Sequence, residues 1–156
     1  MRYLKKLEIK LTKGEYSKIK GRLRFPRETY KIFKSLKDKS QEHLIGIYLD
    51  NDLDITSYDI LTIGSDDQAL VPMKEIFTHA LVMRADYLIL VHNHPSGNIK
   101  PSYEDRDVIS TVRSYSQILQ IRFLDFIIIG DKGRRKSYWS YFEEIDGGEY
   151  SMGAII

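Results

Sequence analysis

The chain has 156 residues, a length that suits one domain able to bury its own hydrophobic core. It contains no cysteine, which excludes disulfides, thiolate zinc sites and thiol nucleophiles and leaves any metal to histidine and carboxylate ligands. Lysine and arginine number 24 against 22 aspartate and glutamate residues, and the resulting formal net charge of +2 gives no support for nucleic acid as a partner.

Residues 1–41 are expected to supply a strand and a helix that pack on the core. This region begins with a charged stretch, and no segment of the chain approaches the ~20 apolar residues of a membrane span, so we expect a cytoplasmic protein without a membrane partner. From Leu7 to Leu11 apolar residues alternate with charged ones, which predicts a short edge strand protected by its lysines. Pro26 favours the first turn of a helix that runs to about Lys37. The apolar stripe of this helix consists of Tyr30, Ile32, Phe33 and Leu36.

Residues 42–145 are expected to form the main domain, in which strands alternate with helices. Two apolar runs over residues 42–50 and 54–63 are separated by a short turn and predict a hairpin. A polar loop over residues 64–68 leads to a helix over about residues 72–84. The apolar residues at helical spacing in that segment are Ile76, Phe77, Ala80 and Leu81.

The second half of this domain continues the alternation. Residues 87–91 predict a buried strand, a helix begins at Ser102, and residues 121–130 and about 137–142 predict two further strands. The inward stripe of the helix is Val108, Ile109, Val112, Tyr115, Ile118 and Leu119. We expect a single mixed α/β sheet flanked by helices, followed by a glycine-rich, loosely held tail over residues 146–156.

Residues able to carry chemistry gather where the strand over residues 87–91 ends. Side chains alternate along a strand, so His92 and His94 point to one face and their imidazoles can converge. Asp105, in the first turn of the following helix, can face back toward them. Two nitrogens and one carboxylate oxygen suit one Zn²⁺ per chain, with a fourth position open to water.

Each of these residues also has a structural interpretation. A bare pair of histidines at a strand end is more often hydrogen-bonded to backbone than bound to metal, and only the spacing to Ser102 and Asp105 favours the metal. Ser102 and Asp105 also fit a capping box, and one carboxylate is not expected to serve fully as both cap and ligand. The residues alone do not identify a general base. The candidates are Glu8, Glu28, Glu42, Glu75 and Glu104.

The same residues carry a resemblance to a known family. His92-x-His94 followed by Ser102 and Asp105, with a distant upstream glutamate, resembles the JAMM motif of the JAB/MPN metalloprotease superfamily. The string VHNHPSGNIKPSYED is similar to its bacterial RadC-like branch, and VPMKEIFTHAL and LDFIIIG extend the likeness from about residue 42 to about residue 130. The resemblance implies an MPN (JAB)-like fold.

The resemblance also implies a reaction and a role for each residue. It implies a zinc metallopeptidase or isopeptidase that hydrolyses an amide bond of a protein or peptide through a metal-activated water. His92, His94 and Asp105 are then the metal ligands, Glu42 is the general base, and Ser102 stabilises the oxyanion. The alternative is a non-catalytic binding module of the same fold in a complex associated with DNA repair or a mobile element.

Two departures from the RadC-like pattern stand out. RadC-like proteins usually carry an Asp-His pair where this chain has Asp125 and Phe126, so any role of that histidine is absent. Asp125 is either a group that orients the site or a strand-end charge. The helix-hairpin-helix region of full-length RadC proteins has no match in residues 1–41, which predicts a stand-alone domain. The sequence gives no prediction of the oligomeric state.

Overall fold

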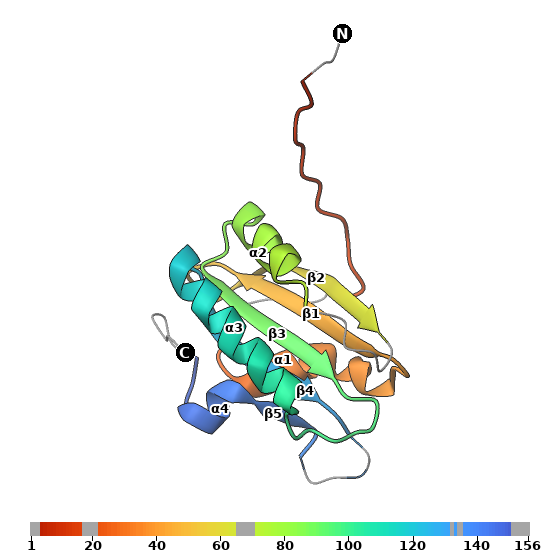
Figure 1. Ribbon diagram of the computed structural model, residues 1–156. Coiled ribbons are helices and arrows are strands. Elements are labelled where there is room, and N and C mark those ends of the chain that lie inside the picture. The colour runs from red at the N-terminus through yellow and green to blue at the C-terminus, as the bar shows by residue number, and fades with distance from the viewer. Residues whose placement is uncertain (1–3, 17–21, 65–70, 132, 134–135, 151–156) are drawn as a thin grey trace.

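A computed structural model describes residues 4–16, 22–64, 71–131, 133 and 136–150, which form one five-stranded sheet with helices on both faces (Figure 1). The strand order is β2-β1-β3-β4-β5. The strands are β1 (Glu42–Leu49), β2 (Ile55–Gly64), β3 (Tyr87–Asn93), β4 (Arg122–Ile129) and β5 (Tyr138–Ser140). The helices are α1 (Pro26–Phe33), the short 3₁₀ helix η1 (Lys34–Asp38), α2 (Met73–Val82), α3 (Tyr103–Leu119) and α4 (Tyr141–Ile145).

The sheet is mixed because its strands are joined in two ways. β1 and β2 form the predicted antiparallel hairpin, and β1 also pairs antiparallel with β3. β3 and β4 pair in parallel, since α3 carries the chain back across one face between them. The expected mixed α/β sheet of the JAB/MPN type is therefore confirmed.

The apolar residues of the central strands are buried on both faces, which explains their continuous apolar runs. One face is covered by α1 and η1 through Phe33 and Leu36, which pack on alternate residues of β1, β3 and β4. The other face is covered by α2 and α3, and there Ile76 and Val112 belong to the second core. The sheet thus has a helix layer on each side, and the polar residues of interest lie at the carboxyl end of its central strand, β3.

The predicted strand from Leu7 to Leu11 is wrong. Residues 4–14 are extended but pair with no strand among the residues that the structure describes, and the side chains of Leu7, Ile9 and Leu11 are exposed. In Figure 1 this segment rises away from the sheet, and its end at Gly14 comes close to β2, against the Tyr58 side chain. An alternating pattern makes a strand only when another strand supplies hydrogen-bond partners.

The carboxyl-terminal third also differs from the expectations. Tyr115 and Ile118 of α3 are exposed, and the buried position between them is taken by Ser116. The last strand ends at Ser140, whose side chain caps α4 by accepting a hydrogen bond from the Glu143 backbone N–H. The tail is not entirely loose, because Tyr150 is buried.

Two other features bear on the earlier expectations. The polar loop predicted over residues 64–68 lies mostly outside the described residues, as does the tail after residue 150. No helix in the described part of the chain combines the length and the apolar character needed to cross a membrane.

Candidate metal centre

The candidate centre lies at the carboxyl end of β3, in the middle of the sheet. His92 is the last residue but one of β3, and His94 follows the strand directly. Between them Asn93 faces away and is fully buried; its side chain accepts a hydrogen bond from the His43 backbone N–H at 2.6 Å and donates one to the Gln41 carbonyl at 3.1 Å. Asn93 therefore ties the beginning of β1 to the end of β3, a role that the sequence analysis missed.

Both imidazole rings are held by backbone carbonyls through the same nitrogen. The Nδ1 atom of His92 lies 2.8 Å from the carbonyl oxygen of His43, and Nδ1 of His94 lies 2.6 Å from that of Asn98. A carbonyl oxygen only accepts, so each Nδ1 carries the hydrogen and the neutral ring keeps its lone pair on Nε2. This is the arrangement that fixes histidine ligands around a metal.

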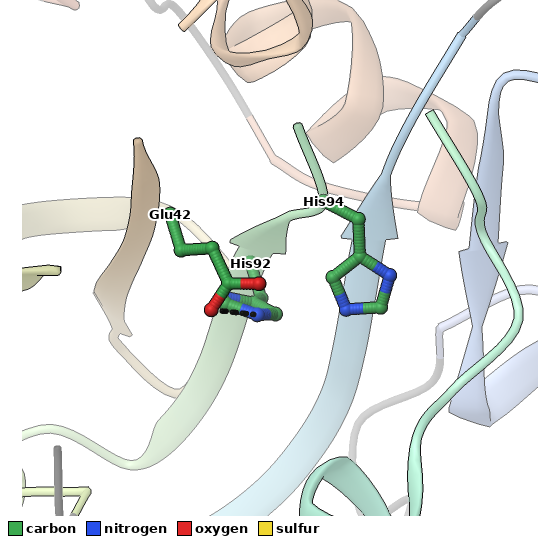
Figure 2. A group of neighbouring side chains, drawn as sticks. All are labelled: Glu42, His92 and His94. Atoms are coloured by element: carbon green, nitrogen blue, oxygen red, sulfur yellow. Dashed lines mark ion pairs between the residues drawn. The ribbon is translucent and has the colours of Figure 1, made fainter. Parts of the chain in front are cut away.

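Glu42 approaches the same point from the first residue of β1. Its Oε2 atom lies 3.8 Å from Nε2 of His92, because β1 pairs with β3 in a register that sets Leu44 opposite His92. Figure 2 shows the carboxylate of Glu42 facing the His92 ring, with His94 beside them. Ligand atoms of Glu42, His92 and His94 all lie within 4.8 Å of one another, so these three residues can hold a metal ion.

Asp105 lies outside that group of three but touches both imidazoles. Its Oδ1 atom is 3.9 Å from Nε2 of His92, and its Oδ2 atom is 3.2 Å from Nε2 of His94. Oδ2 also accepts a hydrogen bond from the Ser102 backbone N–H at 2.7 Å, and the Ser102 hydroxyl accepts one from the Asp105 N–H at 3.0 Å. The predicted capping box is therefore present.

Burial and charge act in opposite directions on these groups. Burial is the largest influence on His92 and lowers its pKa, which keeps that ring neutral. Burial also disfavours the charged form of His94, but the hydrogen bond and charge of Asp105 outweigh it and raise the His94 pKa. Burial likewise disfavours the carboxylate of Asp105, yet its pKa is lowered by the hydrogen bond that Nε2 of His94 donates when that ring is protonated, and by the one from the Ser102 backbone N–H. The carboxylate is thus ionised in the physiological range, and so able to coordinate.

Asp125 neither orients this centre nor lies at a strand end, because it is a buried residue inside β4, so both interpretations are wrong. Its carboxylate is fully buried on the opposite face, where it accepts hydrogen bonds from Ser140, Tyr150 and two backbone N–H groups. Phe126, in contrast, lies on the side of the centre, with its ring centroid 6.4 Å from that of His92. An apolar ring therefore backs the imidazole where RadC-like proteins usually carry histidine.

Comparisons with known proteins agree with this geometry. A family model described as the RadC-like JAB domain matches residues 23–146. A UPF0758 protein of Chlorobium phaeovibrioides is 36% identical over 119 residues, which cover 76% of this chain and 51% of the relative. A UPF0758 protein of Streptococcus gordonii is 36% identical over 116 residues, covering 74% of this chain and 50% of the relative. The chain thus spans about half the length of the curated relatives that it matches.

Proposed function

We propose that this chain, which belongs to the RadC-like JAB domain family, is a zinc-dependent hydrolase of peptide or isopeptide bonds. The observation that carries the proposal is the convergence of two Nε2 lone pairs and two carboxylates from three separate elements. Structural zinc sites are usually closed by four protein ligands, whereas catalytic sites combine three ligands with an open position. Here three ligands and one further carboxylate fit the catalytic type.

His92, His94 and Asp105 are the proposed zinc ligands. Their donor set of two imidazole nitrogens and one carboxylate oxygen is the kind that zinc accepts in hydrolases. The metal, when bound, supplies Lewis acidity, which lowers the pKa of a coordinated water to ~7 and polarises the carbonyl to be cleaved. The chain prepares the site by fixing the Nδ1–H tautomer of both rings and by ionising Asp105.

Glu42 is the proposed general base, and it acts through its side-chain oxygens. It accepts a proton from the attacking water and returns that proton to the amine that leaves. Its side chain is 43% exposed, against 14% for His92, so it reaches the centre from the solvent side where substrate enters. A base at this position is close to the centre without needing to be a permanent ligand.

For Ser102 we propose a second role beside its cap. Its hydroxyl oxygen accepts the Asp105 N–H, which occupies a lone pair and leaves the hydroxyl hydrogen able to donate. We assign that hydrogen to the oxyanion that develops on the cleaved carbonyl. The amino-terminal end of α3 adds a favourable field for the same negative charge.

The ligand assignment predicts a specific pattern of zinc content. We expect about one zinc per chain in the wild type and near none in His92→Ala or Asp105→Ala, because each removes a third of the donor set. Elemental analysis of the purified proteins measures it. The matched controls are His43→Ala and Asp107→Ala, which change neighbouring residues whose side chains lie outside the centre and should keep the metal. Equal zinc in all five proteins would contradict the assignment.

The base assignment predicts that Glu42→Gln keeps zinc and loses catalysis. The amide is similar in size but cannot take the proton, so turnover should fall by at least ~100-fold. A peptide mixture is digested with each zinc-loaded protein, and the products are analysed by mass spectrometry for new amino termini. New termini should appear with the wild type and not with Glu42→Gln.

Two other results would overturn the base assignment. Loss of zinc from Glu42→Gln would make Glu42 a ligand, as its closeness to both histidines also allows. Equal cleavage by both proteins would show that Glu42 is not needed for the chemistry.

A further inference from the structure

The amino-terminal segment over residues 4–14, here called the arm, has the pattern of a strand but pairs with no strand among the residues that the structure describes. Leu7, Ile9 and Leu11 alternate with charged residues, and their exposed fractions are 79%, 56% and 63%. The backbone of the arm makes no hydrogen bond to any other residue that the structure describes. Extended backbone with an apolar side gains stability only against the edge of another sheet.

β2 offers such an edge. It is the outermost strand of the sheet on its side and, within the described part of the chain, pairs along its length with β1 alone. Irregular pairing with β1 interrupts β2 near Thr56 and Leu61, and the stretch between, Ser57 to Ile60, keeps a regular register. The outward N–H and C=O groups of that stretch are therefore set for one more strand.

The two faces of the arm match the two faces of this stretch. Tyr58 and Ile60 lie on the face of β2 that bears α1, and Asp59 lies on the face that bears α2. If Ile9 and Leu11 cover the exposed part of Ile60, the alternation sets Lys10, which lies between them, beside Asp59. Both patterns repeat every two residues, so one register satisfies them together.

The charges of the two segments are also complementary. The arm contains four lysines and one glutamate, whereas residues 50–64 contain four aspartates and no lysine or arginine. Opposite charges on neighbouring strands stabilise pairing, and like charges oppose it. Two arms therefore repel each other, whereas an arm and β2 attract each other.

We propose that the arm of one copy of this chain adds to the β2 edge of a second copy, and that the exchange is reciprocal. The arm of the same chain leaves its own β2 edge instead of following it (Figure 1), and a cavity of about 640 Å³ lies between arm residues 9–14, β2 and the end of α2. We place the strand of the other copy in this space. Reciprocal exchange gives a closed two-fold dimer and covers both edges.

The test is the mass of the full 156-residue chain in solution, measured by light scattering over a dilution series. We expect a dimer of twice 18.3 kDa for the wild type and a monomer for the double variant Leu7→Asp, Ile9→Asp. Both residues are exposed, so the variant keeps its core, and an unchanged melting temperature of the dilute protein checks this. The control is Ile118→Asp, Ile145→Asp, which changes two similarly exposed apolar residues elsewhere and should remain dimeric.

A second pair of variants tests the partner edge. Asp59→Lys should weaken the dimer by placing lysine opposite the arm, and adding Lys6→Asp and Lys10→Asp should restore it. A monomeric wild type overturns the proposal, because no second copy is then bound. A dimer that survives Leu7→Asp, Ile9→Asp also overturns it, since the copies would then meet through another surface.

Discussion

Asp125 is the most unusual single residue of this chain, because its carboxylate has no contact with solvent. Burial raises its pKa to about 7, even though the Phe142 backbone N–H, the Tyr150 and Ser140 hydroxyls and the Phe126 N–H all favour the ionised form. The hydrogen bonds fasten the start of α4 and the tail residue Tyr150 to β4. They explain why a tail expected to be loose is anchored.

The shifted pKa of Asp125 predicts how stability depends on pH. Between the ordinary aspartate pKa of 3.8 and about 7, the folded chain binds the proton and the unfolded chain does not. The stability that the folded chain gains from protonated Asp125 is therefore complete below pH 3.8 and is lost as the pH rises through about 7. The corresponding change in the free energy of unfolding is at most about 4 kcal/mol.

The variant Asp125→Asn isolates this contribution, because its amide does not titrate. Urea unfolding between pH 4 and pH 7 should show a free energy of unfolding that declines less for Asp125→Asn than for the wild type. The surface variant Asp107→Asn should follow the wild-type curve. Parallel curves for wild type and Asp125→Asn would mean that Asp125 titrates normally in the folded protein.

At the scale of elements, the loop from His94 to Ser102 depends on the end of β4. Gly130 follows β4 directly, and a Cβ atom there would lie 2.5 Å from the carbonyl oxygen of Gly97. The His94 backbone N–H is also bonded to the Ile129 carbonyl. The loop that carries one proposed ligand and leads to another is thus seated against β4.

Gly130→Ala should therefore disturb the centre without touching it. Relief of the clash moves Gly97 and the loop, so we expect zinc affinity to fall by roughly 10- to 100-fold, as for other groups that position ligands. Competition with a chelator measures the affinity. Gly64→Ala is the matched control, since a Cβ there meets no atom within 4 Å. Unchanged affinity in Gly130→Ala would mean that the loop adapts freely.

Helices and strands could be predicted from the sequence where the hydrophobic pattern of a segment was matched by neighbouring elements that bury it. The runs that became β1, β3 and β4 are apolar on both sides, and their hydrophobicity alone marks them as buried strands. The segment from Leu7 to Leu11 has an equally clear pattern. A strand also needs another strand to pair with, and none of the described strands pairs with this segment. Ser116 took a buried place in α3 that periodicity would give to Tyr115 or Ile118, because tertiary packing decides which side of a helix faces the sheet.

At the scale of the whole molecule, the centre depends on pairing between distant segments. His92, His94 and Asp105 are near in sequence, so their spacing predicted that they would lie together. Glu42 is not near them, and nothing local distinguishes it among the five glutamates considered as the general base; only the resemblance to the JAMM motif did. It reaches His92 because β1 pairs with β3 in one register, and a shift of one residue would turn its side chain to the other face.

The carbonyl that holds the His92 ring belongs to His43, the residue immediately after Glu42. Any substitution that tilts the beginning of β1 therefore rotates that imidazole and displaces the glutamate in the same movement. The positions of the two side chains are thus coupled. We expect strong epistasis between β1 and β3, such that a substitution in one strand is tolerated only with certain residues in the other.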